Sequence, residues 1–169
     1  MTTVTLPTVP PPPESRGGTD PPPFPLPGRY AVAPDRSLVE LTAWYGPLPT
    51  GRRRVTLTGA SLTVPDGSEQ PVFRFEFVGR AGARSVLVSE QVDSLDGGRR
   101  LRLLADLDVR GVAFPVLLWL RVVERGDDRL LVVGTARLPY RLLRRATGFR
   151  FGRLRPATRL RLLVAAEFA

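Results

Sequence analysis

The chain has 169 residues, of which 43% are hydrophobic, and a formal net charge of +9. This length suits one domain with a core of its own. The sequence contains no Cys and no His. It therefore lacks the residues for disulfides, a thiolate nucleophile, a Ser-His-Asp triad, a His-containing zinc site or a His-ligated haem. We expect a non-enzymatic protein with no catalytic residues, no metal and no cofactor.

The N-terminal stretch is rich in proline. Residues 2–28 contain ten Pro, with runs at 10–13 and 21–23, and Pro fixes φ and has no N–H for a sheet ladder. We therefore predict a disordered tail over residues 1–28. Residues 1–13 have neither the basic n-region nor the apolar h-region of a secretory signal. If Met1 is the true start, the sequence predicts a cytoplasmic protein.

From Arg29 onward, short apolar runs alternate with polar residues at a period of two, the pattern of a strand with one buried face. The pattern predicts about eight strands, near 30–44, 53–64, 72–80, 86–92, 99–109, 115–125, 129–138 and 159–168. Turn residues separate several of them, at 65–67, 96–98 and 126–128. One short helix is predicted over 140–145.

The first and last strands decide how the sheet ends. Segments 37–45 and 159–168 each carry a long apolar face, and an exposed edge of this kind promotes aggregation. If the two strands pair with each other, both edges disappear. The sequence therefore predicts an all-β fold, a closed antiparallel barrel of about eight strands over residues 29–169.

Three segments carry a resemblance to a known family. Residues 103–116 read LLADLDVRGVAFPV, with a turn at Arg110-Gly111-Val112; residues 30–39 read YAVAPDRSLV; and residues 140–152 run from Tyr-Arg to Phe-Gly. In this order they resemble the YceI-like family of lipocalin-like barrels. Two positions depart from the family pattern, Arg36 in place of His and Ala33 in place of Asp. The family's helix-bearing insertion is absent between residues 80 and 86.

The resemblance implies a ligand class. Members of the YceI-like family that act as binders hold polyisoprenoid chains, such as quinone tails, inside the barrel. By this resemblance, the chain binds or carries an apolar lipid of the polyisoprenoid or isoprenoid-quinone type. The inward apolar residues expected to bind it are Phe73, Phe75, Phe77, Leu101, Leu103, Leu118, Leu120, Val132 and Val164. The same residues suit a solid core, so the alternative is a degenerate, ligand-free barrel that serves as an interaction scaffold.

The positive charge is uneven along the chain. All 25 basic residues are Arg; 16 of them, with 6 acidic residues, lie from Arg99 onward, against 9 Arg and 10 acidic residues before it. Such a basic half is interpreted first as a solvated, positive exterior of the barrel. The alternative is that it attracts anionic lipid headgroups or nucleic acid, which makes peripheral contact with an anionic membrane a second expectation. Trp119, beside Arg121, is expected on the outer face of the barrel, where packing beneath the tail or a loop is favoured over an exposed aromatic–Arg patch for a membrane or partner.

Single-stranded nucleic acid is a further alternative partner. Phe149 and Phe151 lie among basic residues, a combination that suits base stacking beside phosphate contacts; the basic residues concerned are Arg144, Arg145, Arg150, Arg153, Arg155, Arg159 and Arg161. The sequence contains no nucleic-acid-binding motif, and the excess of Arg extends over the whole chain, so this partner is disfavoured. The sequence leaves the oligomeric state open, a homodimer included.

Overall fold

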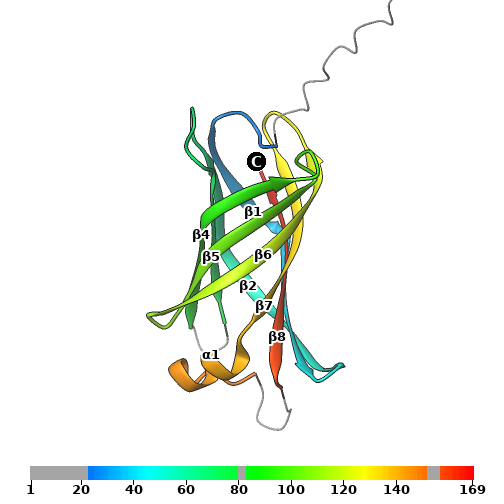
Figure 1. The fold of residues 1–169 in the computed structure, drawn as a ribbon, viewed down its shortest axis with the longest axis vertical. Helices are drawn as coiled ribbons and strands as arrows, with labels where there is room; N and C mark the ends of the chain where they lie inside the picture. Colours follow the sequence, from blue (N-terminus) through cyan, green and yellow to red (C-terminus); the bar gives the residue numbers. More distant parts are fainter. Residues whose placement is uncertain (1–22, 80–82, 152–156) are drawn as a thin grey trace, which may run out of the picture.

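The computed structural model describes residues 23–79, 83–151 and 157–169, which form a closed β-barrel (Figure 1). Eight antiparallel strands follow one another around the barrel in chain order, and β8 pairs with β1. The elements are β1 (Gly28–Tyr45), β2 (Leu48–Val64), β3 (Val72–Val78), β4 (Arg84–Leu95), β5 (Arg100–Val109), β6 (Val112–Arg125), β7 (Leu130–Leu138), α1 (Tyr140–Thr147) and β8 (Arg159–Phe168). The predicted all-β fold and the closed antiparallel barrel are confirmed.

The barrel closes through a long ladder between β1 and β8. Val39 lies opposite Val164, and Ala43 lies opposite Leu160, so the apolar faces of both strands point into the barrel. The ladders of β1 shift register between Ala31 and Val39. By sequence, this segment contains Pro34, a residue type that has no N–H to donate to a ladder. Closure leaves neither strand with an unpaired edge.

The observed strand bounds differ from the predicted ones mainly in β2. This strand begins at Leu48 rather than near residue 53, although residues 48–52 include Pro49 and Gly51 and show no apolar alternation. The ladder with β1 nevertheless continues to the pair of Tyr45 and Leu48. Backbone pairing therefore extends past the buried face into an exposed hairpin. The predicted helix is present and ends two residues later, at Thr147.

Most of the predicted Pro-rich tail lies outside the described residues. The structure describes residues 23–27, just before β1. This segment contacts the end of the barrel opposite α1. Phe24 lies 6.4 Å from Phe73 between ring centroids, and the Leu26 amide donates to the Asp127 carbonyl at 3.0 Å. The Tyr30 hydroxyl donates to the Leu26 carbonyl at 2.6 Å. The barrel therefore makes contacts with the chain from Phe24 onward.

Aromatic side chains fill the half of the barrel far from α1. Phe73 and Phe75 stack with 6.4 Å between ring centroids, and each meets Phe168 edge-on, at 5.6 and 5.9 Å. All three side chains have 0% exposure. Edge-to-face ring pairs stabilise a core beyond their area burial, by about 1 kcal/mol each. In this half, protein side chains occupy the space that a ligand would need.

The predicted turn at Arg110-Gly111 joins β5 and β6. Val109 pairs with Val112, and the two residues between them have φ of 57° and 79°. Positive φ at both central positions is the geometry of a tight hairpin turn whose twist matches its strands. The Asp108 carboxylate accepts a hydrogen bond from the Gly111 amide at 3.0 Å. This turn places Arg110 at the α1 end of the barrel.

Candidate functional site

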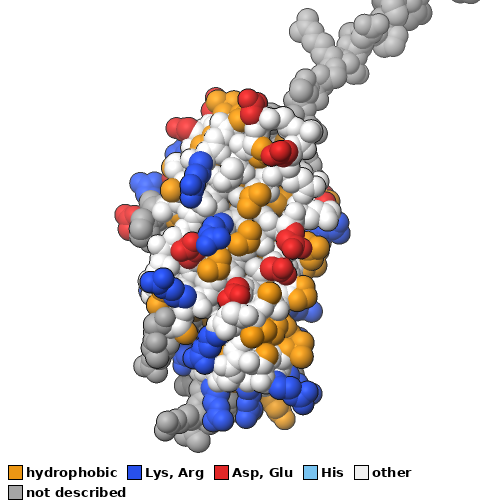
Figure 2. All heavy atoms as spheres, turned by 90° about the vertical axis from the view of Figure 1, so that its left-hand side faces the viewer, with side chains coloured by type: hydrophobic (Ala, Val, Ile, Leu, Met, Phe, Trp, Pro, Cys, Tyr) orange, Lys and Arg blue, Asp and Glu red, His pale blue; other side chains and the backbone are white. Residues whose placement is uncertain are grey.

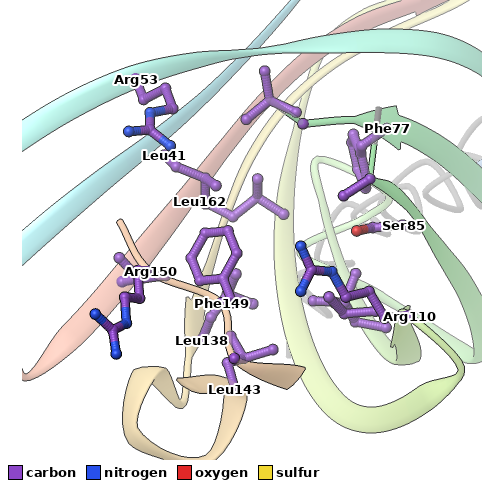
Figure 3. Close-up of a pocket in the computed structure, with 17 residues that line it drawn as sticks. Leu41, Arg53, Phe77, Ser85, Arg110, Leu138, Leu143, Phe149, Arg150 and Leu162 are labelled. Atoms are coloured by element: carbon purple, nitrogen blue, oxygen red, sulfur yellow. The ribbon is translucent and has the colours of Figure 1, made fainter. Parts of the chain in front are cut away.

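The barrel contains a cavity of about 170 Å³ at the end that α1 covers (Figure 3). Its walls are the ends of the strands that meet there, and its outer side is formed by α1 and the residues after it. The lining residues are Leu41, Arg53, Val55, Phe77, Gly79, Ala83, Ser85, Leu107, Val109, Arg110, Leu138, Leu143, Gly148, Phe149, Arg150, Leu160 and Leu162.

The lining is mainly apolar because the inward positions of the strands continue to this end. Leu107 and Val109 extend the inward face of β5, and Leu160 and Leu162 that of β8. These four side chains are each less than 9% exposed. Phe77, the last inward residue of β3, separates the cavity from the stacked rings of Phe75 and Phe73. The cavity thus lies next to the filled half of the barrel.

Residues 140–151, which we call the cap, form the outer side of the cavity. Within α1, Leu143 is 3% exposed and faces the barrel. Gly148 directly follows the helix, and its φ of 67° lets the chain turn back. Phe149 then lines the cavity, and in Figure 3 its ring lies between Leu162 on one side and Leu138 and Leu143 on the other. The Phe151 amide donates to the Tyr140 hydroxyl at 3.3 Å, which ties the two ends of the cap together.

Arg53 connects the cap to β2. It pairs with Leu41 across the β1–β2 ladder and is in phase with Val55, so it occupies an inward position. Its Nη2 donates to the Phe151 carbonyl at 2.6 Å, and its guanidinium lies 5.1 Å from the centre of the Phe151 ring. A charged donor and a cation–π contact on one residue hold the cap against this side of the barrel.

Arg110 connects the cap to the β5–β6 turn. Its Nη1 donates to the carbonyl of Thr147 at 2.8 Å, which is one of the last carbonyls of α1 and lacks a partner within the helix. A cation at a helix C-terminus also interacts favourably with the helix dipole. Arg53 and Arg110 approach the cavity from opposite sides in Figure 3, so the cap is held at two separate points.

The polar groups of the described lining are mainly cationic. Arg53, Arg110 and Arg150 line the cavity together with the hydroxyl of Ser85, and the lining that the structure describes includes no carboxylate. A guanidinium has five N–H donors, and the cap contacts use one of them on Arg53 and one on Arg110. Donors beside an apolar volume suit a ligand that has oxygen acceptors at one end.

The nine residues predicted to bind a ligand all point into the barrel. Each has an exposure of 5% or less; among them, Phe77 lines the cavity. The other eight pack in the middle of the barrel and in its far half, where Phe73 and Phe75 meet Phe168. A period of two identifies inward side chains, but it does not tell where along the barrel the packing leaves space.

Two features of the site were not found from the sequence. One is the cap, which was predicted as a short helix without a role. The other is Arg53, which follows Arg52 and precedes Arg54 and therefore looks like part of a solvated charge run. The signal that identifies it is its spacing from Val55 and Leu57, because all three share one face of β2.

The described part of the chain contains no group of three or more Asp or Glu residues that could hold a metal ion. Within the same residues, no helix has the length and apolar character needed to cross a membrane.

The positions of Phe149 and Phe151 bear on whether the basic segment can bind nucleic acid by base stacking. Phe151 is 3% exposed, and Phe149 packs into the cavity with its ring edge-on to Tyr140. Neither ring offers an open face for base stacking. Trp119, in contrast, lies on the outer face of β6, as predicted, and is 43% exposed among the described residues. It lines an outer groove together with Trp44. The guanidinium of Arg159 lies 5.5 Å from the centre of the Trp44 ring.

The barrel is similar to a solved bacterial structure. The crystal structure of BcnA from Burkholderia cenocepacia matches with a TM-score of 0.60 and 14% sequence identity, over 80% of this chain and 98% of that chain. The match supports the predicted barrel fold. No family model and no curated protein matches the sequence.

Proposed function

We propose that the chain is a non-catalytic binding protein that holds the apolar part of a small lipid in the cavity beneath the cap. The observation that carries this proposal is an apolar cavity at one end of the barrel, covered by a cap that two Arg residues hold in place. The ligand class that we propose is a polyisoprenoid or isoprenoid quinone, which the resemblance to the YceI-like family suggests.

The cavity volume limits how much of such a lipid can enter. A cavity near 150 Å³ holds a ligand the size of benzene, so about 170 Å³ accommodates one or two isoprene units. Burial of one five-carbon unit contributes about 4 kcal/mol, whereas association costs at least about 4 kcal/mol. One unit alone would therefore bind weakly. A long chain inserts only one end, and the rest stays outside the barrel.

The Arg residues at the cavity favour a ligand with oxygen acceptors. Arg53 and Arg110 each retain unused N–H donors beside the apolar lining. A quinone ring combines an apolar face of suitable size with two carbonyl acceptors. Among isoprenoid lipids, we therefore expect a quinone to bind more tightly than a hydrocarbon or an alcohol of the same chain length.

The filled half of the barrel favours a second candidate function. With Phe73, Phe75 and Phe168 packed together, and a cavity below the roughly 300 Å³ where most ligand pockets begin, the barrel also suits a scaffold that binds no lipid. The two functions differ in whether the purified protein takes up a small apolar molecule.

Native mass spectrometry distinguishes these candidates. The full chain is mixed with a quinone that carries one isoprene unit, with an isoprenoid alcohol and with a total lipid extract. Carriage of a lipid predicts a stoichiometric 1:1 complex with the quinone and a weaker one with the alcohol. A protein that remains empty in all three mixtures is the result expected of the scaffold, and it refutes the proposed ligand.

A further inference from the structure

The two ends of the barrel differ in charge. The described connections at the α1 end are residues 46–47, 79, 83, 110–111, 139–151 and 157–158, and those at the far end are 65–71, 96–99 and 126–129. The described residues of the α1-end connections include five Arg and no acidic residue, whereas the far-end connections contain two Arg and five acidic residues. Topology therefore gathers like charges that are dispersed along the chain.

The Arg side chains at the α1 end are accessible. Arg141, Arg144, Arg145 and Arg150 are all exposed, and basic side chains gather at the lower, α1 end of the face shown in Figure 2. Among the described residues, the ion pairs found lie on the barrel wall and toward the far end, and none includes these four residues. Their charge is not neutralised by a neighbouring carboxylate of the described chain.

Exposed apolar side chains lie at the same end. Leu142 of α1 is 57% exposed, and Tyr45 and Leu48, at the tip of the β1–β2 hairpin, are 54% and 65% exposed. Figure 1 shows α1 and this hairpin at the lower end of the barrel. Basic residues that alternate with exposed apolar ones are typical of surfaces that lie in the headgroup region of a bilayer.

From these observations, we propose that the α1 end of the barrel docks on an anionic lipid bilayer. The exposed Arg residues contact the headgroups, while Leu48, Tyr45 and Leu142 enter the boundary with the acyl chains. A bilayer fits this surface better than nucleic acid does, because the apolar tips need an apolar phase, the Phe151 ring is buried, and the Phe149 ring packs into the cavity. This inference does not depend on the proposed ligand.

Vesicle co-sedimentation with the full chain tests the proposal. The vesicles are pure phosphatidylcholine, or phosphatidylcholine with about 30% phosphatidylserine. We expect binding to the anionic vesicles that weakens as salt rises. Each Arg near such a surface strengthens binding about five-fold, so the triple variant R141Q/R144Q/R145Q should bind about 100-fold more weakly. If the chain does not bind anionic vesicles at low salt, the proposal is overturned.

A matched control variant loses three positive charges at the opposite end of the barrel. Arg29, Arg99 and Arg121 are exposed and lie toward the far end of the barrel, so R29Q/R99Q/R121Q has the same net charge as the α1 variant. We expect this control to bind vesicles within a few-fold of the unmodified chain. An equal loss in both triple variants shows attraction by net charge alone and overturns the docking of one end.

The absence of Cys allows a second, independent measurement. Leu48→Cys at the hairpin tip and Ser68→Cys in the far-end loop each provide one labelling site for a polarity-sensitive fluorophore. Docking predicts a blue shift with anionic vesicles for the label at 48 and none for the label at 68. Equal behaviour of the two labels contradicts the proposal, as does tighter binding to a single-stranded oligonucleotide than to vesicles.

Discussion

The guanidinium of Arg53 lies 5.1 Å from the centre of the Phe151 ring and also donates a hydrogen bond to the carbonyl of that residue at 2.6 Å. The two residues are 98 positions apart in the sequence. Through this pair, an inward-facing Arg of β2 fixes the last residue of the cap. The cavity therefore depends on a contact between the barrel wall and the cap, as well as on the barrel itself.

Replacement of Arg53 by Met should loosen the cap without unfolding the barrel. The variant loses one charged hydrogen bond and the cation–π contact, for which we expect a cost of about 1 kcal/mol because the side chain is partly exposed. The Phe151 amide, which donates to Tyr140, should exchange hydrogen several-fold faster. Hydrogen exchange measures this change, with Arg54→Met, on the outward face of β2, as the control. Unaltered exchange in R53M would show that Arg53 does not hold the cap.

The sequence was a good guide to the barrel and a poorer guide to the cavity. The apolar–polar alternation along β5 and β8 identifies which residues point inward. It does not tell how far along the barrel each one lies, because every inward residue is apolar. Leu101 and Leu107 therefore look alike in the sequence. What distinguishes them is the packing of Phe73, Phe75 and Phe168, which meet across the barrel from distant parts of the chain. The contact between Arg53 and Phe151 is equally non-local.

Gly134 of β7 is predicted to be intolerant of any side chain. It lies opposite Leu120 of β6, and a Cβ at this position would stand 2.2 Å from Leu120 Cδ2 and 2.6 Å from the carbonyl oxygen of Trp119. Since one of these neighbours is backbone, G134A should lower the free energy of unfolding by about 1–3 kcal/mol. Denaturant unfolding measures the change.

The control for G134A is Gly59→Ala in β2, where the nearest atom to a new Cβ is 3.9 Å away. This variant should be within about 1 kcal/mol of the unmodified chain, since Ala costs less backbone entropy than Gly. Equal stability of the two variants would mean that β6 and β7 separate easily at Gly134.

The ion pair of Asp93 and Arg102 makes a prediction about pH. Arg102 of β5 donates to the Asp93 carboxylate of β4 from Nε at 2.9 Å and from Nη2 at 2.7 Å. These hydrogen bonds, followed by one from Gln91, lower the pKa of Asp93 below its ordinary value of 3.8. A lowered pKa in the folded state means that the pair stabilises the fold above pH 3.8, and that this contribution is lost as the pH falls through the folded-state pKa.

Substitution of Arg102 by Gln should raise the pKa of Asp93 toward 3.8 and leave a smaller dependence of stability on acid pH. Carboxyl ¹³C chemical shifts followed through a pH titration report this pKa directly. Arg121→Gln, which removes a charge from the neighbouring strand β6, serves as the control and should leave the titration of Asp93 unaltered. An unchanged pKa in R102Q would assign the shift to another cause.

The proposed ligand site can be closed with one substitution. Val55 lines the cavity from β2, and the next residue, Thr56, lies on the outer face of the same strand. Val55→Phe should fill much of the 170 Å³ volume and weaken binding of the one-isoprene quinone at least about ten-fold, since it displaces the buried apolar part of the ligand. Thr56→Phe adds an aromatic ring to the same strand on the opposite face and should bind as the unmodified chain does.

Isothermal titration calorimetry measures both affinities, and thermal unfolding verifies that both variants are folded. If V55F is folded and binds the quinone as tightly as T56F, the ligand occupies a different place and the cavity beneath the cap is not the site.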